Sequence, residues 1–328
     1  MKNISKPNVW CFVTRFSLLH LIAYLVVATV FVVFQSALPE SSRMALDLYQ
    51  PFRILGISTL FGQLLRGLAF GFVFYPFYSL IFERKGGRML LFLSMWGIGL
   101  FGSVEPQPGS IEGILYTHIS LSEHIFVLFA VGMQMGLFVW AIFNEESRIS
   151  KNRYLDGREL FFPNRQIFKG YIFRFVILHL FSYWIIGSLF YQFSGYKDAL
   201  ESMELFTLWR SLETLSAVFL IFFGQIFRGL FLALLLYPFY QIYITKRRGW
   251  TLLYLLMIGL TILGSPLFLT EFISFKGSFS EILQSIIIGI PEIFSQMLVF
   301  SLLFFYWQRK AETKQLVALQ YKMSVFLT

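Results

Sequence analysis

Apolar runs separated by polar or basic segments divide the chain into eight stretches that are suited to membrane helices. A hydrocarbon core of about 30 Å takes roughly 20 consecutive apolar residues of α-helix. The runs lie at residues 16–35, 54–82, 89–104, 123–143, 174–193, 214–244, 251–269 and 282–306. The third run is the shortest and contains several glycines, so it fits a complete span least well. The pattern predicts an all-α polytopic membrane protein with about eight transmembrane helices.

The second and sixth runs carry nearly the same sequence. FGQLLRGLAFGFVFYPFY at residues 61–78 recurs 162 residues later as FGQIFRGLFLALLLYPFY at residues 223–240. Gln, Arg and Pro positions coincide, which a shared apolar composition alone would not produce. A second match begins each half, where Arg15-Phe and Arg174-Phe both precede a Leu-His-Leu triplet. We therefore predict an internal duplication: two tandem parallel four-helix repeats related by a pseudo-two-fold axis along the membrane normal.

Four segments follow from this division of the chain. They are a first four-helix membrane repeat at residues 1–143, a cytoplasmic basic linker at 144–173, a second four-helix membrane repeat at 174–310 and a cytoplasmic tail at 311–328. The second and sixth runs are longer than a perpendicular span needs, so these helices must tilt, bend or protrude. Proline in each Tyr-Pro-Phe-Tyr element offers the bend. A re-entrant hairpin that turns at Gly-Gln-x-x-Arg-Gly is the alternative geometry.

Composition and charge placement agree with a membrane location. The chain is 57% hydrophobic and only 14% charged, whereas a soluble domain carries about 25% charged residues. The formal net charge is +9, but Lys and Arg collect before the first run, between alternate runs, in the linker and in the tail. This is the distribution expected of cytoplasmic loops, and it does not indicate a nucleic-acid partner. We expect an integral protein of the bacterial cytoplasmic (inner) membrane, with both termini cytoplasmic.

Each repeat places an arginine inside a run that is otherwise suited to lipid. Arg66 and Arg228 lie near the middle of the second and sixth runs, where a charge costs at least about 2.5–3.5 kcal/mol. Gln63 and Gln225 precede them by three residues and share nearly the same helix face. A guanidinium beside an amide forms a donor-rich surface suited to a carboxylate or phosphate. The alternative is that each arginine braces a helix junction by binding carbonyl groups or a buried glutamate.

The clearest intramembrane acid is Glu292, which follows Pro291 in the eighth run. The first half has Ala130 at the corresponding place. If Glu292 neutralises Arg228, the other arginine has no obvious acidic partner in its own half, and a positive charge in a low dielectric attracts an anion. We therefore predict a cavity near the membrane centre whose substrate-binding residues are Arg66, Arg228, Gln63, Gln225 and Glu292.

Two histidines are also duplicated. His20 and His179 occupy matching positions, about one turn inside the cytoplasmic end of the first and fifth runs. Two histidines related by a two-fold axis could ligate one b-type haem, with arginines holding the propionates. The alternative is a pair of interfacial histidines that bind backbone carbonyls or headgroups, and the greater depth of the arginines favours this reading over haem.

The first half alone contains an acidic stretch on the outer side, SVEPQPGSIEGILYTHISLSEH at residues 103–124. His118, Glu123 and His124 are weak candidates for ligands of zinc or another divalent ion. The two histidines are six residues apart, which is not a helical i, i+4 pair. The alternative, favoured by the prolines and glycines, is an acidic outer loop with shaped turns that serves as a gate or partner contact.

Catalytic signatures are lacking, so the sequence favours a non-enzymatic role. HExxH, GxSxG and GxxxxGK[ST] do not occur. The main hypothesis is a membrane transporter or lipid-handling protein with an arginine-lined site for an anionic solute or headgroup. The alternatives are a haem-binding or other cofactor-binding redox protein or enzyme, and a non-catalytic subunit with a membrane-protein partner or a second copy of the chain. A transporter requires a cavity at the arginines, whereas a structural subunit requires arginines satisfied by protein alone.

Overall fold

The computed structural model describes residues 6–40, 57–149, 165–202, 208–211, 214–262 and 279–326. The regular elements in these ranges are helices, and the extended pairing described there is a single bridge between Thr117 and Trp209. Six helices are long and apolar enough to cross a bilayer: Val9–Ala37, Thr59–Phe82, Leu121–Ile149, Ile167–Phe193, Leu215–Ile244 and Ile287–Thr313. The chain is therefore all-helical and of the multi-pass membrane class, as the apolar runs predict.

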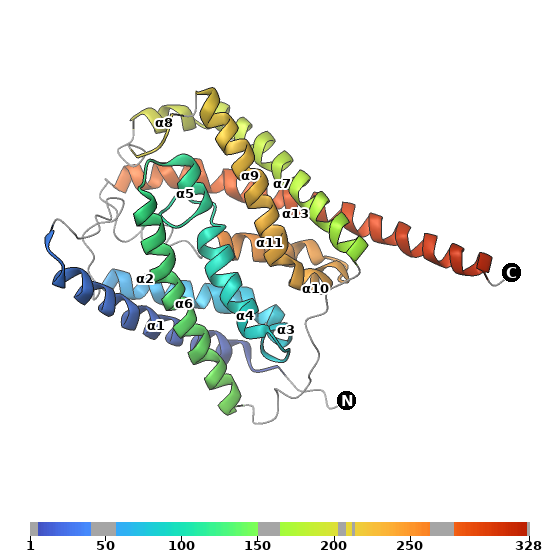
Figure 1. Cartoon of the computed structure of the whole chain (residues 1–328), viewed down its shortest axis with the longest axis horizontal. Helices are drawn as coiled ribbons and strands as arrows, with labels where there is room; N and C mark the ends of the chain where they lie inside the picture. Colours follow the sequence, from blue (N-terminus) through green and yellow to red (C-terminus); the bar gives the residue numbers. More distant parts are fainter. Residues whose placement is uncertain are drawn as a thin grey trace.

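The elements of the first half are α1 (Val9–Ala37), α2 (Ile57–Phe74), the 3-10 turn η2 (Tyr75–Phe77), α3 (Tyr78–Phe82), α4 (Gly87–Phe92), the π-helix η3 (Leu93–Phe101), α5 (Ile111–Tyr116) and α6 (Leu121–Ile149). Those of the second half are α7 (Arg165–Phe193), α8 (Tyr196–Ser202), α9 (Leu215–Leu236), the 3-10 turn η6 (Tyr237–Phe239), α10 (Tyr240–Ile244), α11 (Gly249–Thr261) and α13 (Phe279–Phe326). In space, α1 packs against α2 and α6, while α7 packs against α9 and α13 (Figure 1).

The predicted count of eight spans is not confirmed. The run at 89–104 forms the short α4 and then η3, which ends at Phe101. The run at 251–269 forms α11, whose 13 residues cover about 20 Å, and residues 263–269 lie outside the described ranges. Both described segments are shorter than the hydrocarbon thickness as straight helices. The apolar residues of η3 and α11 pack against other helices on several sides. Their apolar composition therefore reflects contact with protein and does not by itself show that these segments cross the membrane.

Several long helices extend beyond the predicted ends of their runs. α1 begins at Val9 and α7 at Arg165, each more than one turn before the first predicted residue. α6 continues to Ile149, so the predicted linker 144–173 is helical at both of its ends, and residues 150–164 lie outside the described ranges. α13 continues through the predicted tail to Phe326. Charged residues therefore lie within these helices as well as between them.

Both copies of the Gly-Gln-x-x-Arg-Gly sequence lie within continuous α-helix, in α2 and α9. The re-entrant hairpin is therefore wrong for this sequence. The interruption comes at Tyr-Pro-Phe, where η2 and η6 replace one turn of α-helix before α3 and α10 resume. Proline has no backbone N–H to donate within the helix, which explains the change at this point in both halves.

A tight turn that only glycine can adopt follows each interrupted helix. A Cβ on Gly87 would lie 1.6 Å from the carbonyl oxygen of Ile81, and a Cβ on Gly249 would lie 1.6 Å from that of Tyr243. Each pair of contacting residues in the second half is 162 positions after its counterpart in the first. The sequence match therefore extends to matched backbone geometry after the helices that carry the arginines.

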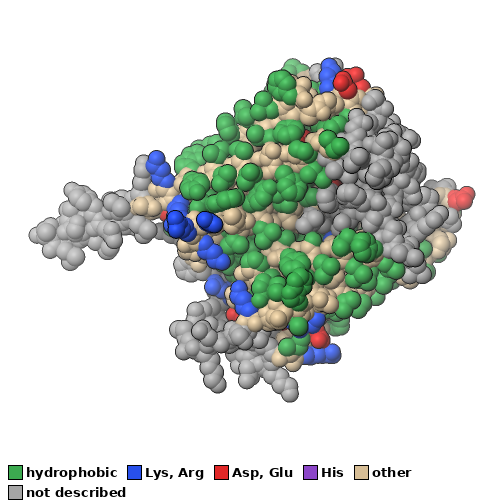
Figure 2. All heavy atoms as spheres, turned by 180° about the vertical axis from the view of Figure 1, so that it is seen from behind, with side chains coloured by type: hydrophobic (Ala, Val, Ile, Leu, Met, Phe, Trp, Pro, Cys, Tyr) green, Lys and Arg blue, Asp and Glu red, His purple; other side chains and the backbone are tan. Residues whose placement is uncertain are grey.

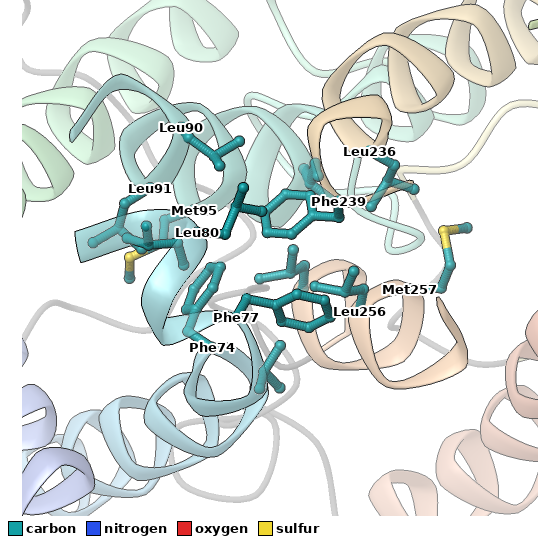
Figure 3. Close-up of a cluster of buried hydrophobic side chains, with 14 of the residues drawn as sticks. Phe74, Phe77, Leu80, Leu90, Leu91, Met95, Leu236, Phe239, Leu256 and Met257 are labelled. Carbon is teal, nitrogen blue, oxygen red and sulfur yellow. The ribbon is translucent and has the colours of Figure 1, made fainter. Parts of the chain in front are cut away.

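The two halves meet through reciprocal contacts in the apolar core. Phe77 and Phe239, at matching positions in η2 and η6, contact each other edge to face with ring centroids 5.1 Å apart (Figure 3). A Cβ on Gly97 would lie 2.6 Å from the Leu235 side chain. A Cβ on Gly259, the counterpart of Gly97, would lie 2.2 Å from Val73, the counterpart of Leu235. The two close approaches thus join residues that are related by the same 162-position offset.

In the first half, a buried carboxylate joins three helices near the beginning of α1. Arg15 donates from Nη2 to Glu146 Oε1 at 2.5 Å, and the Tyr78 hydroxyl donates to Glu146 Oε2 at 2.5 Å. Glu146 is 2% exposed. Charge-assisted bonds of this kind stabilise more than neutral ones, so this carboxylate fastens α1, α3 and α6 together.

In the second half, an amide occupies the corresponding place. Arg174 donates from Nε to Gln308 Oε1 at 2.6 Å, and Gln308 donates from Nε2 to the Tyr240 hydroxyl oxygen at 2.6 Å.

We expect the free energy of unfolding of Glu146→Gln to lie within about 1 kcal/mol of the wild-type value, because a glutamine bridges the same residue types in the second half. Glu146→Leu should cost about 2–3 kcal/mol, because Arg15 and Tyr78 both lose an acceptor. Thermal unfolding of the purified protein in maltoside detergent measures both, and equal losses for the two variants would contradict this account.

The surface carries the apolar side chains expected of a lipid-facing protein. Hydrophobic residues cover much of the face in Figure 2, and Lys and Arg gather mainly toward one end of it. Phe193 and Leu215 are 80% and 71% exposed. Isolated exposed apolar residues are common on soluble proteins, but rows of them along long helices indicate contact with lipid. This supports an integral membrane protein.

Candidate functional site

Arg228 is held inside the protein by two partners from the first half. Its Nη1 atom lies 3.2 Å from Glu112 Oε1 in an ion pair, and its Nη2 atom donates to the carbonyl oxygen of Gly102 at 3.0 Å. Arg228 is 1% exposed and Glu112 is 3% exposed. A buried charge is strongly destabilising without such a partner. The carboxylate at this arginine is therefore Glu112, and not Glu292 as the sequence suggested.

Gln225 extends the ion pair into a chain of hydrogen bonds. Its Nε2 atom donates to Glu112 Oε1 at 2.9 Å, and its Oε1 atom lies 3.1 Å from His179 Nε2. Since an amide oxygen can only accept, His179 donates from Nε2. The prediction that the glutamine and arginine of α9 act on one helix face is confirmed by their shared contact with Glu112.

Residues 102–120 fold inward to bring Glu112 to this position. Ser110 caps α5 by accepting from the N–H of Gly113 at 2.8 Å, so the short helix begins directly before Glu112. A Cβ on Gly224 would lie 2.3 Å from Leu115, which shows how closely α5 and α9 approach. The sequence predicted an acidic outer loop here, but Glu112, Ser110 and Thr117 are buried. Glu112, the acidic residue that pairs with Arg228, therefore faces the protein interior.

A cavity of about 520 Å³ opens beside the ion pair. Its lining residues come from 104–116, α7, α8, α9 and α13 together with Trp209 and Ile262. Arg228 and Glu112 form part of one wall, and a predominantly aromatic set covers others: Tyr116, Tyr183, Trp184, Tyr191, Tyr196 and Trp209. The volume is that of a typical small-molecule site, with a few polar groups in a mainly apolar lining.

Glu292 contributes a second carboxylate to the same cavity. Ile288, Glu292 and Gln296 succeed one another every four residues along α13 and all line it. Gln296 donates from Nε2 to Glu292 Oε1 at 2.9 Å. A Cβ on Gly187 of α7 would lie 3.4 Å from both side chains, so this glycine leaves room for them. Two predicted site residues, Arg228 and Glu292, are thus brought together in one cavity.

Tyr196 provides a hydroxyl group near both carboxylates. It lies in α8 and interacts electrostatically with Glu292 and Glu112. Burial, with these two acids nearby, raises the pKa of Tyr196. Its hydroxyl therefore keeps its proton at neutral pH and can act as a hydrogen-bond donor to a ligand.

Arg66 and Gln63 occupy the matching position in the first half and do not line this cavity. Both are buried in α2, and His20 lies close enough to Arg66 to interact with it electrostatically. A Cβ on Gly67 would lie 2.6 Å from the Cα atom of Ser17, so α1 and α2 meet closely at the arginine. The glycines beside the arginines therefore serve the predicted close helix approach. Of the five predicted site residues, Arg228, Gln225 and Glu292 thus lie at or beside the cavity, whereas Arg66 and Gln63 lie in α2 away from it.

Each histidine lies beside the glutamine or the arginine of its own half. His179 contacts Gln225 directly, and His20 lies near Arg66, so each histidine is level with the polar group of its own half. Arg15 and Arg174, which precede the two predicted runs, lie within α1 and α7. The predicted position of the histidines about one turn inside the cytoplasmic boundary stays a prediction. The haem b hypothesis for His20 and His179 stays a prediction.

The weak metal candidates have other contacts. His124 Nδ1 accepts a hydrogen bond from the N–H of Gly109 at 2.9 Å, which fixes the turn before α5. The backbone N–H of His118 donates to the carbonyl of Leu208 at 2.9 Å. Within the described ranges, no group of three or more His, Cys, Asp or Glu residues is placed to hold a metal ion. The roles of His118, Glu123 and His124 as ligands stay predictions.

Sequence reasoning missed Glu112 and the aromatic lining as site residues. Glu112 lies in an apolar surrounding, Ile-Glu-Gly-Ile-Leu, and this was the available signal that its carboxylate is buried. The aromatic residues gave no such signal, because the chain contains 41 phenylalanines, 16 tyrosines and 7 tryptophans. Comparison of the chain with protein-family models, curated proteins and solved structures found no match.

Proposed function

We propose that this protein is a membrane transporter or lipid-handling protein that binds an anionic solute or headgroup at Arg228. The observation that carries the proposal is the position of this buried guanidinium at the wall of a 520 Å³ cavity. Arg228 has the carbonyl and buried glutamate partners that a structural arginine needs, but such an arginine would need no adjoining space. The cavity therefore favours a ligand site over a non-catalytic subunit.

The ion pair with Glu112 fits a site that is filled and emptied. Between ligands, Glu112 neutralises Arg228 and avoids an uncompensated buried charge. An entering carboxylate or phosphate competes with Glu112 for the guanidinium, which can present two parallel N–H donors to such a group. The low dielectric of the surrounding apolar wall strengthens this attraction.

We further propose that the two halves are tandem parallel repeats related by a pseudo-two-fold axis. Support comes from the matching interruptions at Tyr-Pro-Phe, the matching Gly87 and Gly249 turns and the contact between Phe77 and Phe239. By the positive-inside rule, the Lys- and Arg-rich end is cytoplasmic. The cavity, which α8 helps to line, then lies toward the outer side.

Glu112→Gln tests the competition directly. Because this change removes the competing carboxylate, we expect the variant to bind glycerol 3-phosphate about tenfold more tightly than wild type. Isothermal titration or ligand-induced thermal stabilisation in maltoside measures the affinity, and phosphatidic acid in place of glycerol 3-phosphate distinguishes a lipid headgroup from a free solute. Glu145→Gln, at the far end of α6, is the matched control. Equal affinities of wild type, Glu112→Gln and the control for both probes would reject the proposal.

A further inference from the structure

The cavity contains more acid than the anion site alone requires. Its ionisable lining residues, apart from the tyrosines, are Arg228, Lys197, Glu105, Glu112 and Glu292. Arg228 and Glu112 neutralise each other. Glu292 has no Lys, Arg or His partner in the described part of the chain, and its described polar contact is the amide of Gln296. A carboxylate that is partly buried and faces a cavity favours a cation there.

The aromatic lining favours the same kind of group. Three ring pairs surround the cavity: Tyr183 with Trp184 at 5.9 Å, Tyr191 with Tyr196 at 6.4 Å, and Tyr116 with Trp209 at 5.7 Å between centroids. The faces of Trp and Tyr rings attract cations, and aromatic cages are a common way of recognising quaternary ammonium groups. Acid and aromatic rings in one cavity thus point to an alkylated ammonium.

Glu292 and the anion site belong to one binding volume. Arg228, Glu112 and Glu292 line the same cavity of about 520 Å³. A single small ligand can therefore reach both the guanidinium and the second carboxylate. An anion without a cationic part would meet Arg228 but would offer no group to Glu292.

We infer that the ligand is a zwitterion, with an acidic group for Arg228 and a quaternary or otherwise alkylated ammonium group for Glu292 and the surrounding aromatic rings. This inference rests on the proposed function and narrows its substrate class. A choline phosphate group has this chemistry, whether it belongs to a free solute or to a lipid headgroup. The ammonium offsets the charge of Glu292, and the acidic group takes the place of Glu112.

A matched series of three probes tests the inference in maltoside, which carries no charge of its own. Glycerophosphocholine is the zwitterion, glycerol 3-phosphate is its anionic part and choline is its cationic part. We expect wild type to bind glycerophosphocholine at least tenfold more tightly than either part. Glu292→Gln should abolish the preference for glycerophosphocholine over glycerol 3-phosphate, and Trp184→Leu should reduce this preference. Glu145→Gln, which lies outside the cavity, should leave the preference unchanged.

The outcomes separate the two proposals. Glycerol 3-phosphate binding as tightly as glycerophosphocholine, or an unchanged preference in Glu292→Gln, would overturn the inference and leave the anion site standing. Choline binding as tightly as glycerophosphocholine would overturn both, because the acidic group would then contribute nothing. Lysophosphatidylcholine identifies the source of the group: tighter binding than glycerophosphocholine supports a lipid headgroup, and equal binding supports a free solute.

Discussion

Replacing Arg228 with methionine is expected to destabilise the protein by about 3–5 kcal/mol. The change leaves Glu112 as a buried carboxylate with no cation, and Gln225 is then its one described side-chain donor. Removing one partner of a buried ion pair has this cost because the remaining charge stays desolvated. Thermal or denaturant unfolding of purified Arg228→Met in maltoside measures the loss.

The double variant Arg228→Met/Glu112→Leu separates the charge from the packing. Replacing both ions with apolar groups of similar volume is often neutral, so we expect this variant to recover most of the lost stability. Arg148→Met is the matched control, because its side chain is 82% exposed and lies 3.9 Å from Glu145. An exposed pair contributes little. If Arg228→Met were as stable as Arg148→Met, Arg228 and Glu112 would not be paired inside the protein.

Gly87→Ala and Gly249→Ala are each expected to lose about 3 kcal/mol or more of stability. The new Cβ would lie 1.6 Å from a backbone carbonyl oxygen in both cases, and backbone cannot give way as a flexible side chain can. Such a clash belongs at or above the upper end of measured overpacking costs. Thermal unfolding measures both variants against Gly136→Ala, where a Cβ meets nothing within 4 Å.

Alanine at the control position should be neutral or slightly stabilising, since it favours helix over glycine. The two turn variants should behave alike, because their positions correspond under the proposed duplication. If one of the two were tolerated as well as the control, the matched turn geometry would be wrong for that half. This result would also remove one support for the repeat.

The sequence was sufficient for the features that depend on local pattern. Apolar runs predicted the long helices, and the Tyr-Pro-Phe motif predicted a break in two of them. The cost of a charge in lipid correctly singled out Arg228 as a buried residue. Glu292, the acid in the eighth run, lines the cavity beside it, and its role as a site residue stays a prediction. Each inference needed only residue type, spacing and the low dielectric of the membrane.

Features that depend on contacts distant in sequence could not be predicted in this way. Glu112 and Arg228 are separated by more than a hundred residues, and an inward fold of residues 102–120 brings them together. The pairing of Arg15 with Glu146 is likewise out of reach of local pattern, because the two residues are 131 positions apart. Charge at a helix end and charge bound inside the protein have the same appearance in sequence.

The most direct test of the anion site is the affinity of the stabilised double variant Arg228→Met/Glu112→Leu for glycerol 3-phosphate and glycerophosphocholine. This variant keeps the cavity and the fold but has no guanidinium. We predict recovery of most of the stability lost in Arg228→Met, together with at least a hundredfold loss of affinity for both probes. Retained binding of either probe at wild-type affinity would contradict the claim that Arg228 receives the acidic group.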